Sequence, residues 1–188
     1  MKAVQPQWIF FSATYPSNEN EAIQKKMSEI ISQANQIKLT PESSMDKLKN
    51  IQQYVLKCNP GKKLDFIKDV FLTCEMTQTF IFVNTKNFAE TVHKVLRAAD
   101  LKSYIMFSKM SKEERDSTME RFRKQQINVL ITTDVIARGI DVPEAQLVIN
   151  FDVPQRDRKA DPVTYLHRIG RTGRFGSNGI ALTLYDGE

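Results

Sequence analysis

Cysteine and long apolar runs are both scarce in this chain. Cys58 and Cys74 are the only cysteines among 188 residues, too few for a disulfide framework, which predicts a reducing compartment. No apolar run approaches the ~20 residues that a membrane-spanning helix needs, and the first residues lack the pattern of a secretory signal. No cluster of histidine, cysteine and carboxylate residues suits a metal ion. We therefore expect a soluble intracellular protein without a metal site of its own.

The charge that is present is mainly positive and unevenly placed. Lysine and arginine outnumber aspartate and glutamate by 27 to 22, a formal net charge of +5, which favours a polyanionic partner. The excess gathers between Gln155 and Arg174, where the basic residues Arg156, Arg158, Lys159, Arg168, Arg171 and Arg174 face only Asp157 and Asp161. The end of the chain is therefore where we expect an anion to bind.

Short apolar runs alternate with helical patterns along most of the chain. Strands are expected at 53–57, 79–83, 103–107, 128–132, 146–151 and 179–184, with helices after residue 63, at 86–99 and at 111–124. This alternation predicts an α/β fold, a doubly wound parallel sheet with helices on both faces. In such a sheet, ligands bind at the carboxyl ends of the strands. The longest loop is expected at 154–162.

The N-terminal part does not have enough elements for a domain. A strand at 8–11 and a helix at 18–34 are expected there, followed by a polar, turn-prone stretch. We interpret residues 1–40 as the tail of a preceding domain, 41–50 as a linker and 51–188 as the second domain.

The ten residues Tyr165–Arg174 hold an unusual density of cations. Its three arginines recur every three residues, so a helix or tight turn would crowd them onto one side. A guanidinium is a permanently charged fork that matches phosphate and carboxylate oxygens, and Gly170 and Gly173 allow close backbone approach. The alternative is a solvated basic turn.

Two other candidates have ordinary explanations. Gly61-Lys62 suggests a phosphate-binding loop, but Leu56 stands where the first glycine belongs and Lys63 where a serine or threonine would bind Mg²⁺. His93 falls on the polar side of its expected helix, and we interpret it as a surface histidine. No serine, histidine and aspartate are spaced as a catalytic triad.

The stretch Thr133–Asp141 follows an expected strand directly, which places it at the ligand edge of the sheet. Thr133 offers a hydroxyl group and Arg138 a guanidinium group. Gly139 allows close backbone approach, and Asp141 could accept a hydrogen bond from a sugar hydroxyl. The alternative is that Arg138 pairs with a carboxylate and only stabilises the loop.

Arg115 lies in the first turn of an expected helix that opens with the capping box Ser111–Glu114. The free N–H groups and the dipole of such a helix start favour phosphate. The alternative is an exposed helix charge that pairs with Asp116 or Glu120.

Four of these stretches together resemble successive motifs of the DEAD-box RNA helicase family. They are Ser12-Ala-Thr14, Phe80-Ile-Phe-Val83, Thr133–Asp141 and His167–Arg174, in the family's order and spacing, and they cover nearly the whole chain. The resemblance implies two RecA-like domains that clamp ATP and RNA between them. This chain would hold the tail of the first domain and most of the second.

The resemblance also implies a role for each matching residue at the ATP. Arg171 and Arg174 would be arginine fingers that reach the γ-phosphate, and Asp141, with Gly139 beside it, would meet the nucleotide. His167 would contact the first domain and belong to the catalytic set.

Other matching residues would bind RNA or couple the domains. Thr133, Gly139, Arg115 and Lys112 would hold the RNA sugar-phosphate backbone. Arg138 would stabilise the contacts between the domains, and Ser12 and Thr14 would link hydrolysis to domain closure. Two positions depart from the family's pattern: Lys112 stands where many relatives have glutamine, and Ser108 where they have glycine.

Several family features would lie before Met1: the phosphate loop, the Asp-Glu-Ala-Asp box and the glutamine that reads adenine. ATP with Mg²⁺ is therefore the expected cofactor, with the Mg²⁺ held by the first domain, and this chain alone is expected to be inactive. A closing helix that the family has after its last strand would follow Glu188.

Within the family, the charged loop at 154–162 and the run Val148–Asp152 resemble the subfamily that serves mRNA export at the nuclear pore. That resemblance implies an activator protein and inositol hexakisphosphate as partners, and a protein of cytoplasm and nucleus located at the pore. We expect a monomer. Two alternatives stay open: a non-catalytic RNA-binding or partner-docking module, and a DNA-directed helicase of superfamily 2.

Overall fold

The computed structural model describes residues 25, 29, 48–74, 78–107, 109–133, 145–173 and 177–187. The chain divides into two compact units, Met1–Ser43 and Ser44–Glu188. In the first unit only Lys25 and Glu29 are described, and both are helical. The strand expected at 8–11 lies outside the described residues, and the domain limits 1–40, 41–50 and 51–188 stay predictions.

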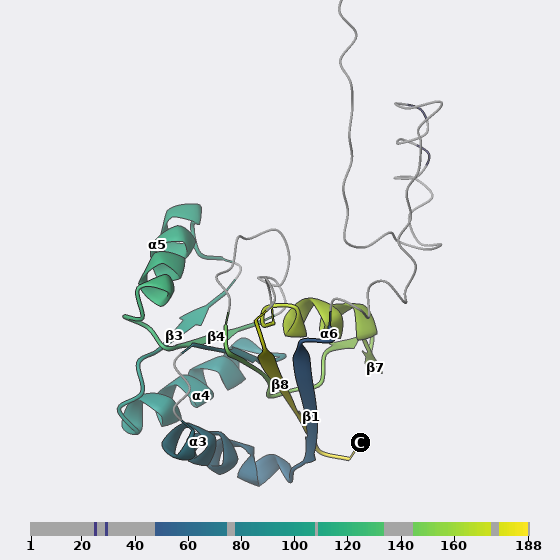
Figure 1. The fold of residues 1–188 in the computed structure, drawn as a ribbon, viewed down its shortest axis with the longest axis horizontal. Coiled ribbons are helices and arrows are strands. Elements are labelled where there is room, and N and C mark those ends of the chain that lie inside the picture. Colours follow the sequence, from purple (N-terminus) through teal and green to yellow (C-terminus); the bar gives the residue numbers. More distant parts are fainter. Residues whose placement is uncertain are drawn as a thin grey trace, which may run out of the picture. The chain divides into compact units, whose positions relative to one another are not determined.

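The second unit contains a sheet of six parallel strands in the order β1-β8-β5-β2-β4-β3. The strands are β1 (Ile51–Lys57), β2 (Thr79–Phe82), β3 (Ser103–Met106), β4 (Val129–Thr132), β5 (Leu147–Asn150) and β8 (Gly179–Tyr185). The helices are α3 (Lys63–Thr73), α4 (Lys86–Ala98), α5 (Lys112–Arg123) and α6 (Pro162–Ile169), with a short 3₁₀ turn η1 at Pro60–Lys62. The expected doubly wound α/β fold is confirmed (Figure 1).

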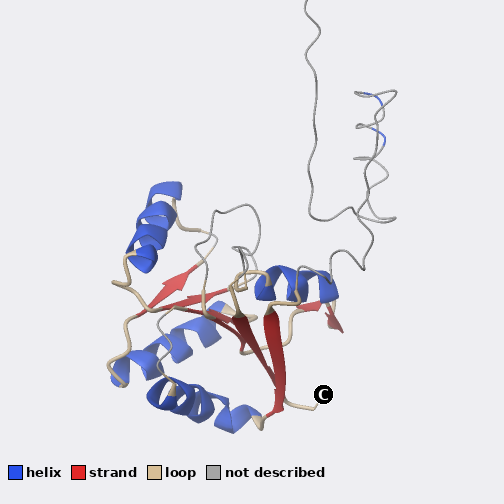
Figure 2. Cartoon of the chain, in the orientation of Figure 1, coloured by secondary structure: helices blue, strands red, loops and turns tan. Residues whose placement is uncertain are grey.

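The central strands are apolar because helices cover both of their faces. All four residues of β2, and likewise of β4, are buried, as expected for strands inside a parallel sheet. Along β2 the side chains alternate: Ile81 packs in one apolar cluster with α3 and α4, while Phe80 packs in another with Phe122 of α5. The Phe80 and Phe122 ring centroids are 5.1 Å apart. Helices therefore lie on both faces of the sheet (Figure 2).

The segment 154–162 is more ordered than the loop expected there. Gln155–Arg156 (β6) and Lys159–Ala160 (β7) form a two-stranded antiparallel hairpin. The turn residues Asp157 and Arg158 both have positive φ, 52° and 62°. Such turns favour glycine or asparagine, so an Asp-Arg turn gives no sequence signal for a hairpin, and the expectation of a loop was wrong for this reason.

Candidate functional site

Helix α6 carries the arginine-rich stretch, and its start is set by Asp161. One carboxylate oxygen of Asp161 accepts from the backbone N–H groups of Val163 and Thr164, each at 3.1 Å, and the other accepts from the Thr164 hydroxyl at 2.6 Å. Pro162 occupies the first helical position, where its missing N–H costs nothing. The start of α6 is therefore anchored by Asp161, the residue just before its first turn.

Arg168 points into the protein rather than towards a ligand. Its side chain is 0% exposed, and its Nη1 donates to the backbone oxygen of Asp152 at 2.7 Å. Its Nη2 donates to Oδ1 of Asn84 at 3.1 Å, and its guanidinium carbon lies 5.2 Å from the centroid of Phe82. The three arginines were expected on one side, and for Arg168 that expectation is wrong, because these acceptors draw it inward.

Asn84 and Asp152 are site residues that sequence reasoning missed. Each lies two residues after the end of a strand, β2 or β5, at the carboxyl ends of the sheet strands. The Asn84 N–H donates to Asp152 Oδ2 at 2.9 Å, and the Asn84 side-chain amide donates to the Val153 carbonyl at 3.1 Å. Polar residues shortly after buried strands were the available signal. They join the ends of β2 and β5 to α6.

Lys63, next to the rejected phosphate loop at Gly61-Lys62, is a third missed residue. Its side chain is 6% exposed and lies 3.8 Å from Asp152 and 3.6 Å from Asp186. Its Nζ also donates to the Phe151 carbonyl at 3.1 Å. The sequence rejected the loop because of residue types. The structure adds that the ammonium is already bound to protein oxygens.

Arg171 lies at the amino ends of the strands, whereas Asn84 and Asp152 lie at their carboxyl ends. Its backbone oxygen accepts from the N–H of Ala145, just before β5, at 3.1 Å. The next residue, Thr172, forms a parallel bridge with Ala145. The ideal Cβ position on Gly173 lies 2.6 Å from Ile51, the first residue of β1. Arg171 is thus held at the amino ends of the strands, whereas ligands were expected at the carboxyl ends.

Gly173 gives the backbone a conformation that other residues rarely adopt. Its φ is +65°, a left-handed conformation that side chains disfavour, and it is buried against Ile51. A glycine is therefore needed here for the bend itself, and the approach of a ligand to it stays a prediction.

Local contacts orient the guanidinium of Arg171. The side chain is half-buried, and its Nε donates to the backbone oxygen of His167, one turn earlier, at 3.2 Å. His167 itself is half-buried on α6. The structure thus brings two of the three expected catalytic residues together. Arg174 lies outside the described residues.

Three expected RNA-binding residues lie at the carboxyl ends of β3 and β4. Thr133 follows β4, and α5, which carries Lys112 and Arg115, begins soon after β3. The expected capping box is present: Ser111 Oγ accepts from the Glu114 N–H at 3.1 Å, and Glu114 accepts from the Ser111 N–H at 2.8 Å. The N-terminus of α5 therefore faces this edge.

The alternative of a paired Arg115 finds no support among the described residues. Glu120 instead forms an ion pair with Lys124 at 2.7 Å, and that pairing lowers the pKa of the Glu120 carboxyl. No salt bridge of Arg115 with Asp116 occurs within the described part of the chain. Arg115 is half-buried and Lys112 is exposed.

Six further residues singled out from the sequence lie outside the described residues. They are Ser12, Thr14, Ser108, Arg138, Gly139 and Asp141. Their roles stay predictions.

His93 is not the surface histidine that the helical pattern indicated. It is half-buried between α4 and β3, and its Nδ1 lies 2.9 Å from the hydroxyl oxygen of Ser103, a hydrogen-bond distance. Burial, followed by the charge of Arg97, lowers the pKa of His93 from its ordinary value of 6.5. Among the described residues, no group of three histidines, cysteines or carboxylates is arranged to hold a metal ion, and no helix is long and apolar enough to cross a membrane.

The family model "Helicase conserved C-terminal domain" matches residues 62–176. The ATP-dependent RNA helicase DBP5 of Saccharomyces cerevisiae is 36% identical over 179 residues, 94% of this chain and 36% of that protein. The human ATP-dependent RNA helicase DDX19A is 36% identical over 184 residues, 97% of this chain and 37% of that protein. The chain therefore spans about a third of the length of these relatives.

The structure of S. cerevisiae Dbp5 bound to RNA and ADP BeF3 superposes with a TM-score of 0.78 at 34% identity, covering 95% of this chain and 44% of that chain. This likeness confirms the expected RecA-like fold class. With a family model matching most of its length and 36% identity to DBP5 along nearly all of it, the chain belongs to the helicase conserved C-terminal domain family and resembles the DEAD-box RNA helicases of the DBP5 and DDX19 type.

Proposed function

We propose that this chain is the C-terminal half of an ATP-dependent RNA helicase that couples ATP hydrolysis to RNA unwinding or RNA–protein remodelling. One observation carries the proposal: two sets of basic residues lie at opposite edges of one sheet. Arg171 is held at the amino ends of β1 and β5, and Arg115 lies beyond the carboxyl end of β3. A module that only binds RNA needs one basic edge, whereas a motor needs one for each ligand.

The Arg171 edge is proposed to serve the nucleotide. Arg171 and Arg174 would stabilise the charge that develops on the transferring phosphoryl group, and His167 orients Arg171 through its carbonyl oxygen. Asp141 and Gly139 are proposed to contact the nucleotide. Both lie in the segment 134–144, which joins Thr133 at one edge to Ala145 at the other.

Mg²⁺ is proposed to be held by the first domain rather than by these residues. Lys63 stands where a phosphate loop would have its Mg²⁺-binding serine or threonine, and its ammonium forms ion pairs with Asp152 and Asp186. When bound with ATP, the ion would neutralise phosphate charge. This chain's contribution to the reaction is then the arginine fork.

The edge at β3 and β4 is proposed to hold RNA through its phosphates. Arg115 and Lys112 lie in the first turn of α5, where the helix dipole adds to their charge, and Thr133 adds a hydroxyl at the end of the neighbouring strand β4. Gly139 is proposed to join them. Contacts of this kind carry no base sequence information.

Residues 1–40, 41–50 and 51–188 are proposed to be the tail of the first domain, a linker and the second domain. Ser12, Thr14 and Arg138 would then transmit hydrolysis into movement between the domains, together with His167. The segment that carries Arg138 begins directly after Thr133 of the RNA edge, which suits a coupling role.

Solved structures of S. cerevisiae Dbp5 with Gle1 and IP6, and with Nup159, support a proposal about partners. We propose that the full-length protein binds an activator protein with inositol hexakisphosphate, acts in mRNA export, and works at the nuclear pore between nucleus and cytoplasm. We further propose that it is a monomer.

Replacement of Arg171 tests the proposed function. In the full-length protein with saturating RNA, Arg171→Ala should lower the single-turnover rate of ATP hydrolysis by about 10³–10⁵-fold, the usual contribution of an arginine finger. Arg171→Lys should restore little, because an ammonium lacks the planar fork. Arg174→Ala should behave like Arg171→Ala. The matched control is Arg97→Ala, an exposed arginine on α4, which should leave the rate unchanged.

Circular dichroism and RNA affinity complete this test. Both should be preserved in Arg171→Ala if the residue acts on the transition state. A variant that keeps most of its hydrolysis rate would instead favour a non-catalytic binding module. Comparing single-stranded RNA with DNA of the same sequence separates an RNA helicase from a DNA-directed one, since only RNA offers the 2′-hydroxyl.

A further inference from the structure

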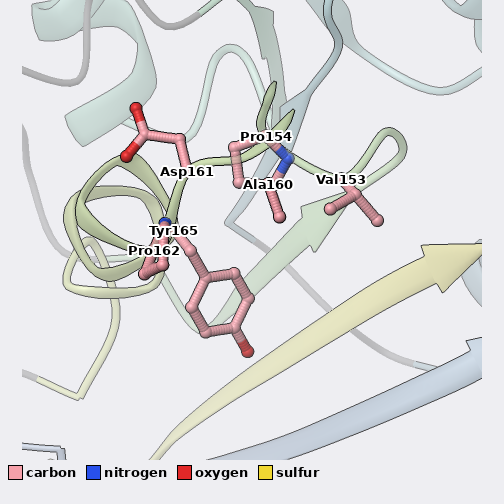
Figure 3. A pocket seen from close by; sticks show the side chains of 6 residues that line it. All are labelled: Val153, Pro154, Ala160, Asp161, Pro162 and Tyr165. Atoms are coloured by element: carbon pink, nitrogen blue, oxygen red, sulfur yellow. The ribbon is translucent and has the colours of Figure 1, made fainter. Parts of the chain in front are cut away.

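A small pocket lies between the β6–β7 hairpin and the start of α6, in the described part of the chain. It has a volume of about 150 Å³ and is lined by Val153, Pro154, Ala160, Asp161, Pro162 and Tyr165. Figure 3 shows these six side chains, which come from the segment just before the hairpin, from β7 and from the start of α6. We call this feature, with the hairpin beside it, the hairpin pocket.

The walls of the hairpin pocket are held by hydrogen bonds, and its polar groups are occupied. The Asp161 N–H donates to the Pro154 carbonyl at 2.9 Å, which closes the hairpin, and the Asp161 carboxylate caps α6. The Tyr165 hydroxyl donates to Gln53 of β1 at 2.9 Å. The remaining lining side chains are apolar. The pocket therefore offers a preformed carbon surface for one apolar side chain.

Apolar surface continues from the pocket along α6. Val163 and Leu166, three residues apart on this helix, are 44% and 42% exposed. Residues three or four apart share a helix face, so Leu166 adjoins both the pocket residue Pro162 and Val163. Neither packs in an apolar cluster of the described core. A partner that fills the pocket would gain further apolar contact here.

The hairpin next to the pocket is basic and conformationally costly. Arg158 and Lys159 are exposed, and residues 155–160 carry three basic side chains against Asp157. Arg158 has a φ of 62°, where glycine would fit without penalty and other residues cost about 1 kcal/mol. The sequence thus keeps an arginine at the tip where glycine would be more stable, which points to a use for its charge.

We propose that the hairpin pocket docks a segment of a protein partner in which one apolar side chain is flanked by acidic residues. The apolar residue would fill the pocket, and its acidic neighbours would pair with Arg158 and Lys159. A phosphate group has nothing to place in an apolar pocket. The proposed RNA contacts follow β3 and β4, whereas the hairpin follows β5, and β2 separates β5 from β4 in the sheet.

This proposal goes beyond the helicase function and does not depend on it. Its test uses the full 188-residue chain without ATP or RNA, so a failure here and a failure of the Arg171 experiment are distinguishable. The probes are two seven-residue peptides, each with three acidic residues on either side of a central leucine or a central serine. Affinity is measured by titration calorimetry at low ionic strength.

The leucine peptide should bind about tenfold more tightly than the serine peptide, because burying a leucine side chain is worth about 1.5–3 kcal/mol. Ala160→Leu fills the pocket from an exposed position on β7 and keeps every charge. It should abolish the preference for leucine. Leu166→Ser, which trims the adjoining surface outside the pocket, should weaken the leucine peptide without removing that preference.

Charge is tested by a matched pair of double variants. Arg158→Ser with Lys159→Ser should weaken both peptides at least about fivefold, as two ion pairs are lost. Lys68→Ser with Lys94→Ser, which removes two exposed cations from α3 and α4, should weaken neither beyond about twofold. Circular dichroism confirms that each variant is folded.

Three results with the peptides would overturn the proposal. They are equal affinity for the two peptides, a leucine preference that survives Ala160→Leu, and equal losses in the two double variants. Inositol hexakisphosphate and a twelve-nucleotide oligouridylate are titrated in parallel. If either of these binds more tightly than the leucine peptide and depends on Arg158 and Lys159 but not on Ala160, the hairpin serves a polyanion and the proposal is wrong.

Discussion

Nη2 of Arg168 donates to Oδ1 of Asn84 across 3.1 Å, which joins the end of α6 to the end of β2. The same guanidinium donates to the backbone of Asp152, which follows β5. One fully buried cation therefore fixes three segments that lie far apart in the sequence. Arg171, three residues later, takes part in neither of these two bonds. We therefore expect the two neighbouring arginines to have separable effects, Arg168 on folding and Arg171 on the proposed chemistry.

Arg168→Ala should destabilise the fold by about 3–5 kcal/mol, because it removes two hydrogen bonds of a fully buried charged group, to the Asp152 carbonyl and to Asn84 Oδ1. Chemical denaturation of the full chain, followed by circular dichroism, measures this loss. Arg171→Ala is the control from the same stretch and should cost no more than about 1 kcal/mol, the worth of one hydrogen bond. Similar losses for the two variants would contradict the separation of roles.

Arg115→Ala should weaken RNA binding alike for all sequences and lower the salt dependence by about one phosphate contact. The half-buried Arg115 carries no described ion pair that would hold it away from a ligand, since Glu120 pairs with Lys124. Fluorescence anisotropy at several salt concentrations, with two unrelated RNA sequences, provides the measurement. Arg123→Ala, at the far end of the same helix, should leave the slope unchanged. A loss confined to one RNA sequence would argue for base contacts instead.

The 188-residue chain by itself should hydrolyse no ATP. Phosphoryl transfer needs a phosphate cradle, a metal site and a positioned water. The described residues supply neither a phosphate cradle nor a metal site. The assay is phosphate release from purified chain with and without RNA, compared with buffer. RNA-stimulated turnover above that background would show that the two-domain interpretation is wrong.

Stability should fall as the pH drops from about 7 towards 5, in part because of His93. Burial and Arg97 lower the pKa of His93 in the folded state below its ordinary 6.5. The unfolded chain therefore binds the proton more readily, so the contribution of neutral His93 is present above pH 6.5 and is lost as the pH falls through the folded pKa.

His93→Gln should remove that part of the pH dependence, since glutamine does not titrate. The measurement compares the free energies of unfolding of the two proteins at several pH values. The difference between them should change between pH 7 and 5 and be constant above. A difference that stays constant over the whole range would contradict a lowered pKa for His93.

Local sequence patterns determined the sheet and the helices α3, α4 and α5. Four-residue apolar runs such as Thr79–Phe82 and Val129–Thr132 cannot be exposed, and the helical patterns between them leave parallel pairing as the way to cover both faces. Capping at Ser111 was readable because a capping box needs only residues within one turn. The motif stretches were readable for a similar reason, since each is continuous in the sequence.

Tertiary contacts decided which arginine faces which environment. The periodicity of Arg168 and Arg171 is the same in the sequence, but the acceptors of Arg168 come from residues 84 and 152, and no local pattern brings those together. The edge at which Arg171 lies depends on the bridge from Thr172 to Ala145, and the hairpin depends on strained residues that give no turn signal. Local propensity acts within a few residues, whereas the burial and partners of a charged side chain are set by the whole fold.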